Sequence, residues 1–153
     1  MQDRFKFRVF ISDKKNSKNS LTGMFKVHSL HTGTNKAIIS SLYGNVSIKL
    51  DNNILMQCTG LKDKNGKLIY EGDIISENWH KYILEWGRGD FQLRDFAKGS
   101  VYTFPAGICI EKCEIIGNIY QNPELLEDNN GYSAKVCHGA DEAIEYVRGF
   151  IDG

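Results

Sequence analysis

Apolar and polar residues alternate with a period of two along most of the chain, and short turns rich in glycine and asparagine separate the alternating stretches. The N-terminal third shows this pattern over residues 5–11, 24–30, 37–43 and 46–50. In the first of these ranges the apolar side chains alternate with lysine and arginine, as in a strand with one face buried. The pattern therefore predicts antiparallel strands in this part of the chain.

Residues 55–75 predict three further strands joined by two tight turns. Asn65-Gly66 is a strong hairpin signal, and we expect a type I′ turn, in which both central residues have positive φ. Gly72 interrupts the next apolar run and allows a backbone angle that a Cβ would disfavour. This stretch predicts a strand–turn–strand–turn–strand unit.

More strands are expected between residues 79 and 120, at 79–86, 91–96, 101–104, 108–110 and 113–120. The triplet Arg88-Gly89-Asp90 lies between two of them, so we interpret it as a turn and not as an adhesion motif. The predicted fold class is mainly β, a small barrel or strongly bent antiparallel sheets.

Two helical signals follow. Asn122-Pro123-Glu124 combines a capping side chain, a proline at the first helical position and an acid in the first turn. Apolar residues then recur on one face of a predicted C-terminal helix, namely Ala140, Ala143, Ile144, Val147 and Ile151. A helix of about twelve residues is marginal alone, so we expect it to dock on its own body or on a second subunit.

The expected organisation has three parts: a basic β-rich part (1–53), a barrel-like core (54–127), and a linker with the C-terminal helix (128–153). The net charge is zero, but residues 1–50 hold nine Lys or Arg against two Asp, a net charge of +7. The remaining residues carry −7. This asymmetry predicts docking of the basic part on an acidic surface, and nucleic-acid binding is the alternative.

Candidate chemistry is sparse. Asp63, Glu71 and Asp73 could serve as acid–base or cation-binding groups, but two of them adjoin turns, where aspartate is favoured for structural reasons. The four cysteines and four histidines lack metal-ligand spacing. No nucleophile or phosphate-binding motif is present. We therefore predict no enzymatic activity, no metal site and no cofactor.

Seven aromatic residues between 79 and 104 could form a stacking platform for single-stranded nucleic acid, or they could form the core. The core interpretation is favoured, because the surrounding segment is acidic. The seven are Trp79, Tyr82, Trp86, Phe91, Phe96, Tyr102 and Phe104.

Three motifs carry a family resemblance. The segment from Thr59 to Ile75, including Tyr70-Glu-Gly-Asp73, resembles the signature of the YopX family of phage and prophage proteins. The segments 5–8 and 113–126 resemble its opening and closing motifs. The resemblance implies a mostly β fold encoded by mobile genetic elements, and it implies no particular activity. Val9-Phe10 and the tail after residue 127 depart from the family pattern.

Two function hypotheses follow. The first is a non-enzymatic interaction protein that forms homo-oligomers through its basic part or through Ile144, Val147 and Ile151, with a host or phage protein as a further partner. The second is a nucleic-acid-binding accessory protein that uses Lys14, Lys15, Lys18, Lys26 and Lys36. The chain shows neither a signal-peptide pattern nor a membrane-length apolar run, so we expect the bacterial host cytoplasm and no membrane partner.

Overall fold

The computed structural model describes residues 6–11, 22–42, 44–50, 54–106 and 108–126. These residues form two antiparallel sheets and short 3-10 helices. The six-stranded sheet has the order β4-β3-β2-β1-β5-β6, and the five-stranded sheet has the order β10-β9-β8-β7-β11. The strands are β1 (Phe7–Ile11), β2 (Gly23–His31), β3 (Lys36–Ser41), β4 (Gly44–Lys49), β5 (Ile54–Lys62), β6 (Leu68–Tyr70), β7 (Asp73–Glu77), β8 (His80–Gly87), β9 (Asp90–Asp95), β10 (Val101–Thr103) and β11 (Glu114–Asn118).

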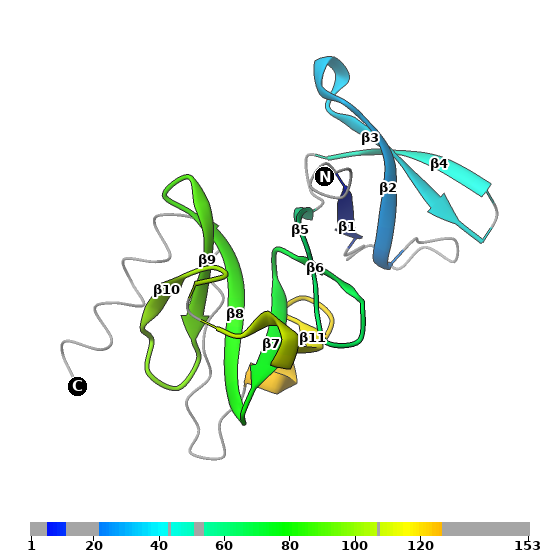
Figure 1. Ribbon diagram of the computed structural model, residues 1–153. Coiled ribbons are helices and arrows are strands. Elements are labelled where there is room, and N and C mark those ends of the chain that lie inside the picture. Colours follow the sequence, from blue (N-terminus) through cyan, green and yellow to red (C-terminus); the bar gives the residue numbers. More distant parts are fainter. Residues whose placement is uncertain (1–5, 12–21, 43, 51–53, 107, 127–153) are drawn as a thin grey trace.

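The strands are divided between two parts of the molecule, and β6 of the six-stranded sheet packs against the five-stranded sheet through Ile69 (Figure 1). Strands β2, β3 and β4 lie at one end, β7 to β11 lie at the other, and β5 runs between them. β1 pairs with both β2 and β5, so the boundary expected near residue 53 falls in the connection between β4 and β5, within one sheet. The sheets are open, and the expected mainly β fold with antiparallel sheets is therefore confirmed, whereas the barrel is not. A barrel would require the outer strands of a sheet to pair, and β10 and β11 remain at opposite edges.

Three clusters of apolar side chains stabilise these sheets. One is built on β7, β8 and β9 with Ile75, Leu84 and Leu93 at its centre. A second lies around Ile74 and Ile83 on the other face of the five-stranded sheet. The third packs the inner face of β1 to β4. The period of two in the sequence thus arises because successive side chains of a strand point to opposite faces of its sheet.

Local details differ from the expectations in three places. Gly66 has a φ of 79°, but Asn65 does not have positive φ, and the N–H of Asp63 bonds to the carbonyl of Lys67. The turn is therefore a three-residue loop with glycine in the left-handed position, because the aspartate side chain holds Asn65 in a right-handed turn.

The other two differences concern short helices. Part of the strand expected at 108–110 begins the 3-10 helix η3 (Ile110–Lys112), where the Cys113 thiol bonds to the carbonyl of Cys109. The helix expected after Asn122 is the 3-10 helix η4 (Pro123–Leu126). A further 3-10 helix, η2 (Thr32–Thr34), connects β2 and β3. The predicted C-terminal helix lies outside the described residues, and none of the described helices is long and apolar enough to span a membrane.

Candidate functional site

The three sequence motifs meet at one buried point. Arg8 on β1 forms an ion pair with Asp73 at the start of β7, and the two side chains are 12% and 1% exposed. Arg8 Nη2 also donates to the carbonyl of Glu71 at 3.2 Å. The Arg8 guanidinium carbon lies 4.6 Å from the centre of the Tyr70 ring, in cation–π geometry. The opening motif is therefore anchored to the signature motif by charge, hydrogen bonds and ring contact.

The closing motif joins the same point through Asn118. Its Nδ2 lies 3.5 Å from Asp73 Oδ1, and its Oδ1 accepts a hydrogen bond from the N–H of Tyr120 at 3.0 Å. Tyr120 in turn stacks on Phe10 of β1, with ring centres 5.6 Å apart. We call Arg8, Tyr70, Asp73, Asn118 and Tyr120 the motif junction. Its two charged groups, Arg8 and Asp73, are paired with each other, and among the described residues the buried Arg8 Nε has no hydrogen-bond partner.

Gly72 explains why the signature motif turns sharply at this point. Its φ is 78°, and a Cβ there would lie 3.2 Å from Asn118 Nδ2 and from the Tyr120 ring. Its N–H donates to the carbonyl of Leu84, and its carbonyl accepts from the N–H of Ile119. Glycine is thus required here both for the backbone angle and for the close approach of β11.

Asp63 has a different structural role. Its Oδ1 accepts hydrogen bonds from the N–H groups of Asn65 and Lys67, and its Oδ2 accepts from the N–H of Ile115. Burial raises the pKa of this carboxyl, but the three backbone donors outweigh burial and hold the pKa below its ordinary value. Asp63 therefore closes the β5–β6 turn and ties it to β11.

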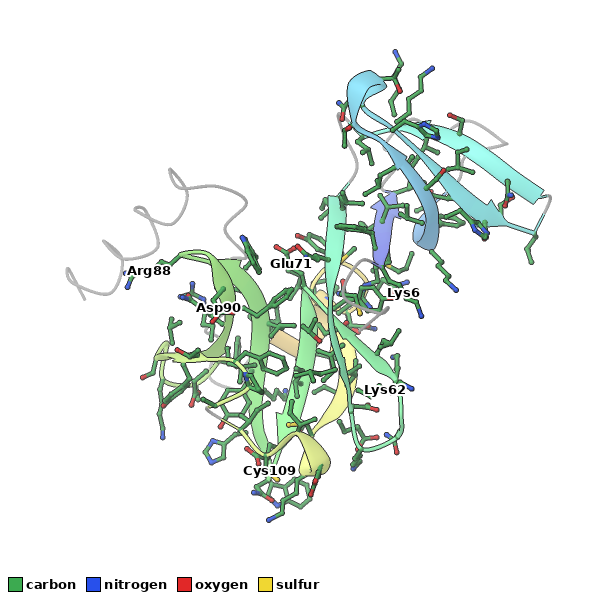
Figure 2. All side chains as sticks on the ribbon, turned by 45° about the horizontal axis from the view of Figure 1, so that its top comes forward. Lys6, Lys62, Glu71, Arg88, Asp90 and Cys109 are labelled. Carbon is green, nitrogen blue, oxygen red and sulfur yellow. The ribbon has the colours of Figure 1, made fainter. Side chains whose placement is uncertain are left out.

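Glu71 carries a half-buried carboxyl close to a second acid, Glu85. Burial raises the pKa of the Glu71 carboxyl. Hydrogen bonds with the backbone of Gln57 and Trp86 lower the pKa, the charge of Glu85 raises it, and the net result is a raised pKa. Burial also raises the pKa of the neighbouring Tyr120 to about 12, and the charges of Glu71 and Glu85 add to this effect. Figure 2 shows Glu71 and Cys109 at opposite ends of the body formed by β5 to β11.

The three acids therefore do not form a common site. Asp63 belongs to a turn, Asp73 belongs to the motif junction, and Glu71 carries a half-buried carboxyl that is influenced by the charge of Glu85. Among the described residues, no group of three His, Cys, Asp or Glu side chains is arranged to hold a metal ion. Burial raises the pKa of the Cys113 thiol to about 12, so at neutral pH this thiol is protonated and is a poor nucleophile.

A basic ladder crosses the end of the six-stranded sheet. Lys36 on β3 lies directly opposite His31 on β2 and directly opposite Lys49 on β4, and all three residues are exposed. Lys26 precedes the inward-facing Val27 on β2, so it projects from the same outer face as the ladder. The described part of residues 6–50 contains no aspartate or glutamate.

Of the lysines predicted from sequence, Lys26 and Lys36 are thus placed on one face. Lys14, Lys15 and Lys18 lie outside the described residues, as do Ile144, Val147 and Ile151. Lys49 was not identified from the sequence. A signal for it was present, because Lys49 ends an alternating strand and the neighbouring strand begins with Lys36. The pairing of Arg8 with Asp73, which has no local signature, was also not identified from the sequence.

The aromatic set divides between interior and surface. Phe91 and Phe104 are buried, and Tyr82 and Phe96 pack partly buried against the core clusters. The other three are exposed: Trp79 at 98%, Trp86 at 48% and Tyr102 at 38%. The core interpretation therefore holds for only part of this set.

Comparison with known proteins shows the family of this chain. The family model described as "YopX protein" matches residues 6–127, which include every residue of the junction. The chain belongs to the YopX family. No curated protein sequence matches it.

Two solved structures are similar to this chain. The protein EF1440 from Enterococcus faecalis is 26% identical, with 80% of this chain and 97% of that chain covered and a TM-score of 0.51. The protein yopX from Bacillus subtilis is 22% identical, with 81% and 99% covered and a TM-score of 0.48. In this YopX-family protein, Arg8 of the six-stranded sheet and Asp73 of the five-stranded sheet join the two sheets.

Proposed function

We propose that this protein is a non-enzymatic interaction protein of phage or prophage origin that self-associates in the host cytoplasm through the edge strand β4. The observation that carries this proposal is the character of that edge. Among the described residues β4 pairs only with β3, and its six residues include no proline, no acid and one lysine, at its end. Unpaired backbone groups along such an edge are a template for a strand from another chain.

The tip of the β3–β4 hairpin supports the same surface. Leu42 is 99% exposed next to the start of β4. If β4 paired with β4 of a second copy, the exposed Leu42 of each copy would lie close to the paired strands. The other edge strands are shorter, and β10 and β6 have only three residues each.

Sedimentation velocity at micromolar concentrations and low salt tests this proposal. We expect a dimer, and we expect Ser47→Lys on β4 to shift it to monomer, because an added charge on an edge opposes strand pairing. Thr103→Lys on β10 is the matched control and should leave the dimer intact. A monomer for the unmodified chain at high micromolar concentration would refute the proposal.

The basic ladder favours a second candidate function, nucleic-acid binding. Lys26, Lys36 and Lys49 place several positive charges on one exposed face, and such a face attracts anionic ligands. Phosphate groups of DNA or RNA fit this role, and binding should weaken steeply with salt.

Fluorescence anisotropy with labelled single- and double-stranded DNA and RNA tests it. We expect Lys26→Glu/Lys36→Glu to weaken binding and to reduce its salt dependence. Lys98→Glu/Lys112→Glu is the control, because it changes the same number of charges at exposed residues outside the strands β2 to β4. Equal binding by the two variants, or no binding at low salt, would refute this candidate.

A further inference from the structure

The turn between β7 and β8 places a tryptophan in a conformation that tryptophan rarely adopts. Asn78 and Trp79 are its two central residues, with φ of 47° and 72°. Both angles are positive, as a type I′ turn requires, and Asn-Gly is the favoured sequence there. The side chain of a bulky residue is strained in this left-handed region. Trp79 therefore occupies a position where the local backbone favours glycine.

The side chain of Trp79 gains no packing in return. It is 98% exposed, more than any other aromatic side chain of the described residues. The strained backbone opposes folding, and an indole that stays in water contributes no burial to offset that strain. Such a combination points to a contact made by this residue outside the described structure, because strain is commonly retained at binding sites.

The chain leaves the described structure close to this turn. Lys81 is two residues after Trp79, and its Nζ donates to the carbonyl of Leu125 at 3.0 Å. Leu126 is buried and is the last described residue. The N–H of Cys109 bonds to Glu77 Oε1, so the turn lies at the end of the molecule marked by Cys109 in Figure 2. The C-terminal 27 residues thus begin beside the base of the Trp79 turn.

We propose that Trp79 is the docking site for the C-terminal segment of its own chain, through the apolar face formed by Ile144, Val147 and Ile151. The spacing of these residues predicts an amphipathic helix of about twelve residues, and a helix of that length needs a surface on which to dock. The intervening residues 127–139 reach up to about 43 Å when extended, so they allow the segment to turn back. A tether of this length gives a millimolar effective concentration, which favours the same chain over a second copy.

Fluorescence of Trp79 in the full chain tests the proposal. The chain has two tryptophans, so Trp86→Phe leaves Trp79 as the only emitter. We expect blue-shifted emission and slow acrylamide quenching in this parent. Ile144→Ser/Val147→Ser should shift the emission to that of a hydrated indole and speed quenching. Glu142→Ser/Glu145→Ser also introduces two serines, on the opposite face of the predicted helix, and should have no effect.

Each other outcome overturns the proposal. Hydrated emission in the parent, or no response to Ile144→Ser/Val147→Ser, means that the segment does not cover Trp79. A blue shift that appears only as protein concentration rises means that a second copy supplies the cover. Tryptic cleavage after Arg148 gives an independent measurement, and it should be faster in Trp79→Gly than in the unmodified full chain.

Discussion

Arg8 and Asp73 lie 65 residues apart in the sequence and form a buried ion pair between β1 and β7. This contact joins the six-stranded sheet to the five-stranded sheet, with Tyr70 and Asn118 around it. In this chain the three motifs thus meet where the two open sheets are joined. A buried pair of this kind is sensitive to the loss of either partner.

A double-mutant cycle on this pair should reveal strong coupling. Arg8→Met leaves the Asp73 carboxylate buried without its cation, so we expect a loss of about 3–5 kcal/mol in unfolding free energy. Arg8→Met/Asp73→Asn should lose much less than the sum of the two single changes. Urea denaturation measures each term. The Arg94–Glu85 pair, whose side chains are about one-third exposed, is the control and should couple by only about 0–1 kcal/mol.

Asp63→Asn should destabilise the protein in a pH-dependent way. At pH 7 the amide places an N–H donor against one or more of the backbone N–H groups now bonded to the carboxylate, at a cost of about 1–3 kcal/mol. Because the folded-state pKa of Asp63 lies below its unfolded value, its stabilisation is complete above about pH 4 and is lost as pH falls through the folded pKa. Denaturation at pH 7 and near pH 3 should therefore give a smaller difference at the lower pH.

Glu71→Gln should increase the stability of the protein, whereas Asp63→Asn decreases it. Its folded-state pKa is raised, so the charged form opposes folding once the pH rises above the unfolded value of about 4.3. We expect the substitution to increase stability at pH 7 and to have little effect at pH 4. Glu111→Gln removes one charge at an exposed position and is the comparison. A loss of stability at pH 7 would contradict the expected sign.

Gly72→Ala should be much more harmful than Gly89→Ala. Both glycines have positive φ, 78° and 86°, so the backbone cost of alanine is similar at the two sites. Only at Gly72 does the added Cβ also meet neighbours, Asn118 and Tyr120. We expect Gly89→Ala to cost about 1 kcal/mol and Gly72→Ala to cost roughly 1–3 kcal/mol more. Thermal unfolding of the two variants measures the difference, and equal losses would mean that β11 can move away from the turn.

Trp79→Gly should stabilise the fold when the C-terminal segment is undocked. In the Ile144→Ser/Val147→Ser background, glycine relieves the left-handed strain at φ of 72°, and we expect a gain of about 1 kcal/mol. In the unmodified chain the same change also removes the proposed docking contact, so the gain should be smaller or reversed. Urea denaturation in the two backgrounds checks this, and identical effects would argue against docking at Trp79.

Much of the fold could be predicted because its signals are local. The alternation of apolar residues on β1 to β4 specifies strands with one buried face, and Gly72 and Gly89 mark turns that need positive φ. The Arg88-Gly89 turn follows from the same reasoning. These features depend on neighbours one to four residues away, so a single sequence contains the information.

Contacts between distant segments required the tertiary structure. Nothing near Arg8 indicates that its partner is Asp73, and nothing near Lys36 shows that Lys49 lies opposite it, because strand order and register decide both. The exposure of Trp79 is likewise unpredictable from an aromatic residue in a strand-rich region, since burial depends on which elements cover it. The sequence by itself determined most of the strands, the position of turns such as the one at Gly89, and the family, but not the conformation of the turns at Asn65 and Trp79. Only the folded chain decided which charges are paired and which rings remain in water, because those outcomes are set by packing between segments far apart in the chain.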